Sequence, residues 1–212
     1  MKKLIMCGRY VVTNAVTKTK GLVKSAIQIE DNENYNAHPY QNLPVIKKYT
    51  NGSALEKLKW GIVPSWSKKK DFKPLINSRL ETIDEKISFK KLIKLKRCIA
   101  IADGFYEWKR TEKEKKPFFF QRQDKKTIYF AGIYDENEFC LITEQASENL
   151  LAIHHRQPVI LNQKDLKSYL DLQLDGSAFL KEAKKPRLEF YEVSKDVNKP
   201  TNNSVSLIQK LN

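Results

Sequence analysis

A cysteine near the start of the chain, Cys7, offers the most distinctive chemistry in the sequence. It follows Met6, so initiation at Met6 or loss of residues 1–6 leaves a thiol and a free α-amine on adjacent carbons. An α-amine with a pKa of about 7.7–8.0 attacks aldehydes, and a thiol with a pKa of about 8.5 adds to the imine, closing a five-membered thiazolidine. The alternative is an ordinary buried cysteine at the start of a strand, as most free cysteines are.

Three further residues suit contact with a phosphate-bearing ligand. Arg9 follows Gly8, which allows close approach of the backbone, and its guanidinium suits phosphate. Asn77 and Arg79 alternate in a short extended run, so we expect them to share one face. The amide would orient a carbonyl or sugar and the guanidinium would bind phosphate. The alternative is a turn asparagine followed by a surface arginine.

Glu107 lies between Tyr106 and Trp108 in an aromatic strand pattern. A carboxylate among aromatic rings can have a raised pKa and transfer protons near neutral pH. Strand alternation, however, points Glu107 away from both rings. The stretch by itself therefore favours an outward-facing glutamate on a half-exposed strand.

His154 precedes His155 and Arg156. A histidine at the end of a helix and beside cations can act as a proton shuttle near neutral pH. The alternative, a structural or surface histidine, is favoured when this stretch is considered alone.

Aromatic residues interleave with lysines between Lys59 and Lys73. This arrangement is typical of single-stranded nucleic acid binding, because bases stack on rings while phosphates contact lysines. Trp60 is predicted to lie in the core. Trp66, within a Pro-Ser-Trp-Ser loop, is harder to explain as a core residue.

The chain has 212 residues with a formal net charge of +14, which favours a polyanionic partner, nucleic acid first and an anionic membrane surface second. Generic surface lysine is the alternative. No apolar run reaches membrane-spanning length and no signal peptide is complete, so an intracellular protein is expected. Three cysteines are too few for a disulfide framework, and no zinc-ligand spacing occurs among cysteines and histidines, so no structural metal is expected.

The elements that must position these residues are mostly strands. A hairpin is predicted around Asn51-Gly52, a buried strand over Arg97 to Ala102, and a second strand over Phe105 to Lys109 that ends in a charged hairpin tip. A helix or an irregular segment is predicted over residues 14–29, and short helices over residues 88–95, 148–154 and 165–170. A meander of strands is predicted over residues 118–143, a late strand over residues 190–194, and a loop over residues 197–212. We predict one α+β domain over residues 1–212, with a curved, mainly antiparallel sheet and flanking helices.

Several of these stretches, in this order, resemble the SRAP family, the SOS-response-associated peptidases or abasic-site-processing proteins. They are Met6-Cys7-Gly8-Arg9-Tyr10, Trp60-Gly61-Ile62-Val63-Pro64-Ser65-Trp66, Asn77-Ser78-Arg79-Leu80-Glu81-Thr82, Ala102-Asp103-Gly104-Phe105-Tyr106-Glu107-Trp108 and His154-His155-Arg156-Gln157-Pro158-Val159-Ile160-Leu161. Tyr191 to Ser194 and Val197-Asn198 complete the order, so the resemblance covers nearly the whole chain.

The resemblance implies a compact α+β protein that captures abasic sites in single-stranded DNA as a covalent thiazolidine. It implies Cys7 as the nucleophile, with supporting catalytic residues Asn77, Glu107 and His154. It implies DNA contacts by Arg9, Trp66 and Arg79. It also implies a thiol autopeptidase activity that exposes the N-terminal cysteine. No cofactor or metal is expected, and a cytoplasmic monomer is expected.

The sequence departs from the family pattern at a few positions. Residues 1–5 precede the usual Met-Cys start, so residues 1–6 form an extension that would block the α-amine while it is attached. His155 stands where an aspartate is usual, Gln157 where a methionine is usual, and His38 where a small residue is usual. These substitutions leave the His154 position intact.

Two other functions remain as alternatives. A thiol peptidase acting on other proteins would use Cys7, His154 and Glu107 in the usual roles, and would cleave generic peptides. A non-covalent module for single-stranded DNA would form complexes that fall apart on a denaturing gel.

Overall fold

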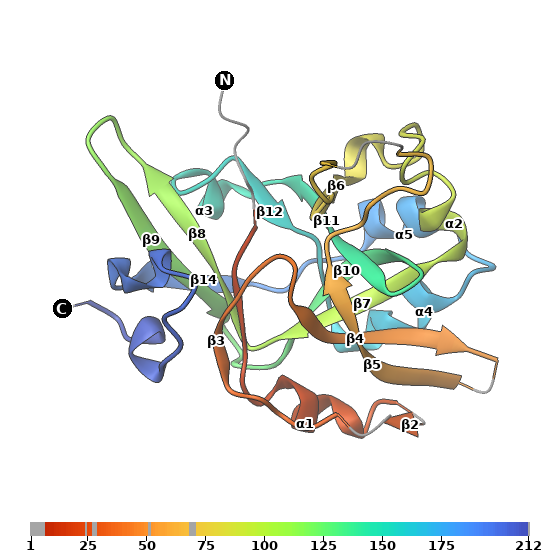
Figure 1. The fold of residues 1–212 in the computed structure, drawn as a ribbon, viewed down its shortest axis with the longest axis horizontal. Helices are drawn as coiled ribbons and strands as arrows, with labels where there is room; N and C mark the ends of the chain where they lie inside the picture. The colour runs from red at the N-terminus through yellow and green to blue at the C-terminus, as the bar shows by residue number, and fades with distance from the viewer. Residues whose placement is uncertain (1–6, 24, 27–28, 51, 68–70, 212) are drawn as a thin grey trace.

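Two β-sheets of mostly antiparallel strands form the frame of the protein, as the computed structural model shows (Figure 1). The structure describes residues 7–23, 25–26, 29–50, 52–67 and 71–211. Within these residues a five-stranded sheet has the order β14-β9-β8-β1-β3, and a nine-stranded sheet contains the remaining strands. The pairings of β5 with β2, β5 with β11 and β6 with β11 are parallel. The prediction of an α+β fold with a mainly antiparallel sheet is confirmed.

The strands of the five-stranded sheet are β1 (Tyr10–Val12), β3 (Asn34–Ala37), β8 (Gly104–Arg110), β9 (Lys115–Arg122) and β14 (Leu188–Glu192). Those of the nine-stranded sheet are β2 (Ser25–Ala26), β4 (Asn42–Tyr49), β5 (Gly52–Trp60), β6 (Asn77–Arg79), β7 (Arg97–Ala102), β10 (Ile128–Asp135), β11 (Glu138–Gln145), β12 (Arg156–Pro158) and β13 (Ile160–Leu161). The predicted β4–β5 hairpin forms, although Asn51 lies outside the described residues. The predicted strand over residues 97–102 is confirmed.

The helices are short and lie outside the sheets. They are α1 (Ala15–Lys20), α2 (Leu92–Leu95), α3 (Glu148–Leu151), α4 (Leu166–Leu170) and α5 (Gly176–Glu182), with 3₁₀ turns η1 (Leu80–Thr82), η2 (Gln163–Asp165), η3 (Lys195–Asn198) and η4 (Val205–Ile208). Residues 14–29, predicted as a helix or an irregular segment, contain α1 and β2. The predicted helices over residues 88–95 and 148–154 extended too far, and α5 was not predicted. The tail, predicted as a loop, contains η3 and η4. Within the described residues, the structure contains no helix with the length and apolarity needed to cross a membrane.

An aromatic cluster joins the two sheets in one core. The Trp60 ring stacks on Phe139 at a centroid distance of 6.2 Å and lies 5.0 Å from the Tyr10 ring. Tyr10 in turn meets Phe130 edge-on at 5.6 Å. Because Tyr10 belongs to β1 while Trp60, Phe130 and Phe139 belong to the other sheet, this packing anchors β1 against the nine-stranded sheet. Trp60 is fully buried, as predicted.

Gly104 begins β8 at a place that has no room for a side chain. A Cβ atom there would lie 2.1 Å from a ring carbon of Phe119 and 2.7 Å from the carbonyl oxygen of Phe120. Both neighbours belong to the paired strand β9, and Phe119 is buried, so neither can move away freely. We therefore expect Gly104→Ala to lower the free energy of unfolding by about 3 kcal/mol, as overpacking does in closed cores.

Urea denaturation of this variant beside Gly21→Ala measures the effect. A Cβ at Gly21, at the end of α1, meets no atom within 4 Å, so that control should be close to neutral. Equal stabilities of the two variants would contradict the packing described for β8 and β9.

Candidate functional site

The backbone nitrogen of Cys7 lies against the carboxylate of Glu107. Its N–H donates a hydrogen bond of 2.7 Å to Glu107 Oε1, and both residues are buried. The contact arises because β1 pairs with β8 through Tyr10 and Phe105, which carries the segment before β1 across β8. Cys7 has a φ of 41°, a left-handed conformation that costs energy for a residue with a side chain. The structure thus places the nitrogen and the carboxylate of the two predicted residues together.

Burial shapes the acid–base properties of this pair. It raises the pKa of the Cys7 thiol well above its usual value, and the charge of Glu107 acts in the same direction. Burial also raises the pKa of Glu107, against the charge of His154 and the hydrogen bonds with Cys7. A carboxyl group with a raised pKa can give and take protons closer to neutral pH. The interpretation of Glu107 as an outward-facing surface residue is wrong, because the segment before β1 covers it.

His154 follows α3 and is buried, so the interpretation as a surface histidine is also wrong. Its backbone N–H donates to the carbonyl oxygen of Leu150 at 2.9 Å, and its ring Nδ1 accepts from the backbone N–H of Arg156 at 3.1 Å. Backbone contacts therefore fix the ring orientation, and proton transfer to a ligand would use Nε2. The charge of His154 acts to lower the pKa of Glu107, against the larger effect of burial.

A bidentate ion pair between Glu81 and Arg156, which the sequence analysis did not predict, stabilises the backbone beside His154. Arg156 Nη1 and Nη2 donate to the two carboxylate oxygens of Glu81 at 2.6 and 2.9 Å, and Nη2 also donates to the carbonyl oxygen of Thr143 at 2.8 Å. Burial acts to raise the pKa of Glu81, but hydrogen bonds from Arg156 leave it below its ordinary value. The pair connects η1 to β12, so it holds in place the backbone that orients His154. Both residues lie inside the stretches that carry the family resemblance, but their pairing is a long-range contact.

Asn77 and Arg79 lie on β6 with alternate residues facing opposite ways. Ser78 between them is buried, Asn77 is half-buried and Arg79 is exposed. The prediction that Asn77 and Arg79 share one face is confirmed. The strand is held by parallel pairing with β11 and by Trp60, whose indole Nε1 donates to the carbonyl oxygen of Ile76 at 2.9 Å.

Trp66 is exposed, as its loop position predicted. The residue is 52% exposed, and its ring meets that of Phe72 edge-on at a centroid distance of 6.0 Å. An exposed indole offers a face on which a base can stack. The neighbouring lysines 68–70 lie outside the described residues.

Arg9 makes hydrogen bonds within the protein. Its Nη1 donates to Asn36 Oδ1 at 2.8 Å and to the carbonyl oxygen of Val197 at 2.9 Å, and burial lowers its pKa. These bonds tie the segment before β1 to β3 and η3. Its phosphate contact stays a prediction.

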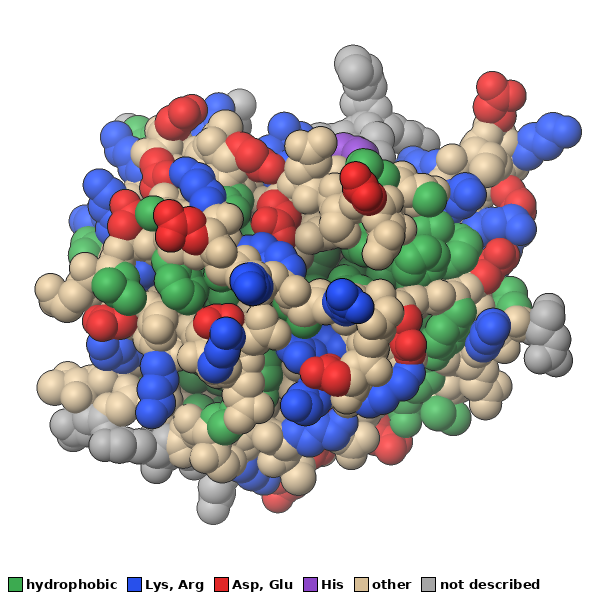
Figure 2. Space-filling model, turned by 180° about the vertical axis from the view of Figure 1, so that it is seen from behind, with side chains coloured by type: hydrophobic (Ala, Val, Ile, Leu, Met, Phe, Trp, Pro, Cys, Tyr) green, Lys and Arg blue, Asp and Glu red, His purple; other side chains and the backbone are tan. Residues whose placement is uncertain are grey.

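Charges of both signs are mixed on the face of the molecule opposite to the view of Figure 1. Figure 2 shows Lys and Arg side chains interspersed with Asp and Glu over one face, without a single continuous basic stripe. On β9, Lys115 Nζ sits 4.3 Å from the centroid of the Trp108 ring. Burial, and then the charge of Arg110, lower the pKa of Lys115, while the charge of Glu107 opposes them.

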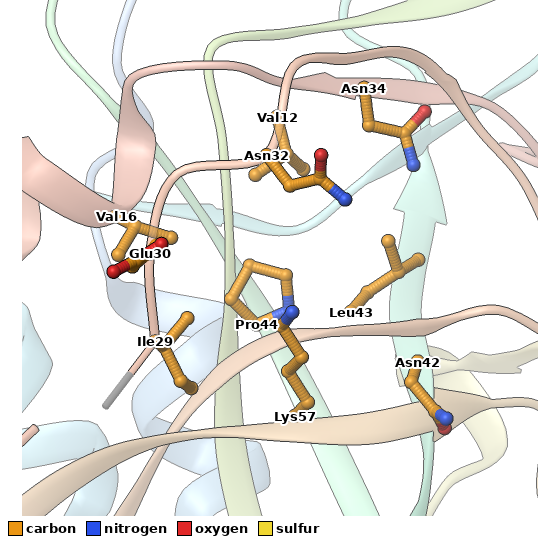
Figure 3. Close-up of a pocket in the computed structure, with 10 residues that line it drawn as sticks. All are labelled: Val12, Val16, Ile29, Glu30, Asn32, Asn34, Asn42, Leu43, Pro44 and Lys57. Carbon is orange, nitrogen blue, oxygen red and sulfur yellow. The ribbon is translucent and has the colours of Figure 1, made fainter. Parts of the chain in front are cut away.

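A small hollow lies elsewhere, between α1, β3, β4 and β5 (Figure 3). Its volume of about 40 Å³ has room for about one water molecule, and none of Cys7, Asn77, Glu107 and His154 lines it. Within the described residues no group of three or more His, Cys, Asp or Glu side chains is arranged to hold a metal ion. The site at Cys7 is therefore the candidate for chemistry.

Comparisons with known proteins point to one family. Residues 6–200 match the family model described as SOS response associated peptidase (SRAP). The chain is 34% identical over 222 residues to the abasic site processing protein YoqW of Bacillus subtilis, covering 96% of this chain and 99% of that protein. It is 30% identical over 223 residues to the abasic site processing protein YedK of Escherichia coli, covering 96% and 99% respectively.

A solved structure supports the same conclusion for the fold. A crystal structure of a protein from Bacteroides thetaiotaomicron superposes with a TM-score of 0.82 at 22% identity, covering 97% of this chain and 99% of that one. At this identity the likeness concerns the fold alone, and the sequence relatives carry the assignment. The chain belongs to the SRAP, or SOS response associated peptidase, family.

Proposed function

We propose that this protein captures abasic sites in single-stranded DNA by forming a covalent thiazolidine with Cys7 as its first residue. The observation that carries the proposal is the 2.7 Å contact between the Cys7 nitrogen and the buried Glu107 carboxylate. In a chain that begins at Cys7 this nitrogen is an amine, and Glu107 is placed to move its protons. Full-length relatives named abasic site processing proteins support the choice of substrate.

In the proposed reaction the site residues act one after another, from opening of the sugar ring to closure of the thiazolidine. His154 protonates the ring oxygen of the abasic sugar as the bond from this oxygen to C1′ breaks, and water takes the proton of the C1′ hydroxyl. The open form carries an aldehyde at C1′, and Asn77 orients the sugar. The Cys7 amine adds to C1′, and Glu107 transfers the protons needed to expel water and leave an imine. The thiol then adds to the imine carbon, so that one C–N and one C–S bond form and one water leaves.

A raised thiol pKa is compatible with this order of events. The Cys7 thiol stays protonated until the imine forms, and its proton passes to the imine nitrogen as the sulfur attacks the imine carbon. The raised pKa of Glu107 keeps a proton available for dehydration nearer neutral pH than an ordinary glutamate allows. Above the pKa of Glu107 the carboxylate is ionised, so this contribution to the rate is lost as pH rises.

Intact mass spectrometry with an abasic oligonucleotide tests the proposal. A chain starting at Cys7 should give a species whose mass is the sum of protein and oligonucleotide less one water, stable to denaturant. An oligonucleotide with an intact base at the same position is the control. Cleavage of generic peptides without this species would favour the thiol peptidase, and a complex seen only under native conditions would favour the non-covalent module.

Two side chains should contribute to DNA binding in separable ways. Trp66→Ala should weaken binding of single-stranded DNA by roughly 1–3 kcal/mol, the value of one stacked base, with the slope of log affinity against log salt unchanged.

Arg79→Ala should reduce the slope of log affinity against log salt by about 0.7–1, the value of one phosphate contact. Fluorescence anisotropy across salt concentrations measures both.

The exposed Lys167 on α4 supplies a matched control for the loss of one positive charge. Lys167→Ala should leave the affinity and the slope nearly unchanged. An unchanged slope in Arg79→Ala would place its guanidinium away from the phosphates. Arg9→Ala is less informative, because it also removes the bonds to Asn36 and Val197.

A further inference from the structure

Tyr40 lies in the turn between β3 and β4 with an exposed side chain and a strained backbone (Figure 1). The residue is 55% exposed, and its φ of 77° is in the left-handed region that favours glycine. This conformation costs energy for a residue with a side chain, and it persists where the surrounding structure enforces it. Tyrosine at this position therefore adds strain to the turn while more than half of its surface stays exposed.

Hydrogen bonds on both sides fix this turn. The Tyr40 N–H donates to the carbonyl oxygen of Trp60 at 2.8 Å, and the Trp60 N–H donates to the carbonyl oxygen of Gln41 at 2.9 Å. Oε1 of Gln41 accepts from the backbone N–H of His38 at 3.2 Å and from Asn34 Nδ2 at 3.1 Å. The backbone of Tyr40 is thus held against the end of β5.

The Tyr40 ring lies over the backbone of Gly61, next to the segment that leads into β6. A Cβ atom at Gly61 would lie 3.5 Å from ring carbons Cδ1 and Cε1 of Tyr40 and 2.9 Å from Cβ of Pro74. The indole N–H of Trp60 binds the backbone just before β6, and the exposed Trp66 follows Gly61 in the same segment. Two exposed aromatic rings are therefore carried by neighbouring segments of the candidate site.

We propose that Tyr40 is a second stacking platform for an unpaired nucleobase, so that single-stranded DNA is held by two rings, Tyr40 and Trp66. This inference rests on the proposed function for the identity of the ligand. A ring that the fold already holds in place loses little conformational freedom when a base stacks on it. Every base has a π-face, so the contact selects unpaired bases over paired ones without selecting a sequence.

Two oligonucleotides of equal length test this contact by fluorescence anisotropy at one low salt concentration. One carries thymine at every position, and the other consists of tetrahydrofuran spacers, which keep the phosphates but have neither bases nor aldehydes. Tyr40→Ala should weaken binding of the thymine oligonucleotide roughly fivefold to 150-fold, the range for one stacked base. It should leave binding of the spacer oligonucleotide unchanged, because no base is there to be lost.

Three further variants separate the ring from the backbone and from general aromatic exposure. Tyr40→Phe keeps the ring and should bind thymine as the unchanged protein does. Tyr40→Gly should lose the same affinity as Tyr40→Ala but unfold at a higher urea concentration, because glycine adopts a positive φ without strain. Tyr49→Ala is the matched control: this tyrosine is 45% exposed at the opposite end of β4, and its loss should not change binding.

None of these binding measurements uses an abasic aldehyde, so they are separate from the test of capture. Losses of equal size with both oligonucleotides, or no loss with either, would overturn the inference. A Tyr40→Gly variant that binds thymine as tightly as the unchanged protein would overturn it as well. If a chain that begins at Cys7 forms no adduct with an abasic oligonucleotide, the proposed capture fails, while a loss confined to the thymine oligonucleotide still assigns Tyr40 to base stacking.

Discussion

We expect Cys7→Ala to abolish the denaturant-stable adduct with abasic single-stranded DNA while leaving non-covalent binding in place. The expected loss is complete, because alanine has no sulfur to close the ring and the imine left behind is hydrolysed. Binding should persist because two of the three predicted DNA contacts, Trp66 and Arg79, lie on other segments of the chain, and the substitution leaves the third, Arg9, unchanged. A denaturing gel measures the adduct and fluorescence anisotropy measures binding.

Sodium borohydride makes this test sharper. Added during the reaction, it reduces an imine to a stable amine, so Cys7→Ala should again become crosslinked if its first residue carries a free amine. The buried Cys98 supplies the control, since Cys98→Ala removes a thiol from the core but leaves the Cys7 site unchanged. An undiminished adduct in Cys7→Ala without reductant would exclude thiazolidine formation.

Local sequence patterns predicted the positions of the strands that carry the site residues more accurately than they predicted whether those residues are buried. Alternation over Asn77 to Arg79 correctly gave two side chains on one face, because a strand repeats every two residues whatever surrounds it. Alternation also correctly turned Glu107 away from Tyr106 and Trp108. The predicted solvent exposure of Glu107 was wrong, because the Cys7 segment covers the face of β8 that carries this residue. Cys7 is 100 residues distant from Glu107 in sequence, so no local pattern contains this contact.

The remaining errors have the same origin. The Glu81–Arg156 pair joins residues 75 positions apart, and no local pattern contains such a contact. For α5 a local signal was present: Asp175 caps the helix by accepting from the backbone N–H groups of Ser177 and Ala178. The motifs of the SRAP resemblance named Cys7, Glu107 and His154 together, which residue-by-residue interpretation did not.

The second large expected effect is on adduct formation, and it depends on whether residues 1–6 are still attached to Cys7. A protein that retains residues 1–6 should form no durable adduct, whereas one that begins at Cys7 should form it in full. In the longer chain the Cys7 nitrogen is an amide whose lone pair is delocalised into a carbonyl group, so it cannot form an imine. The thiol alone would give only a reversible thiohemiacetal. Proteins encoded from Met1 and from Met6 should be compared by intact mass and by crosslinking.

Processing of the longer chain would involve the same atoms. Attack of the Cys7 thiol on the carbonyl carbon of Met6 would break the C–N bond and form a thioester, with Glu107 donating the proton that the departing nitrogen needs. Water would then hydrolyse the thioester. The hydrogen bond from the Cys7 nitrogen to Glu107 places the proton donor for this step, and the positive φ of Cys7 adds backbone strain beside the bond to be cleaved.

Glu107→Gln in the chain encoded from Met1 separates processing from capture. The amide side chain keeps the size of glutamate but cannot donate and recover a proton as a carboxyl group does, so residues 1–6 should stay attached and no adduct should form. The same substitution in the chain encoded from Met6, after removal of Met6, should slow adduct formation without abolishing it, because the amine is already free. If the longer chain stays uncleaved yet crosslinks as durably as the shorter one, the nitrogen of Cys7 takes no part in capture and the thiazolidine mechanism is wrong for this protein.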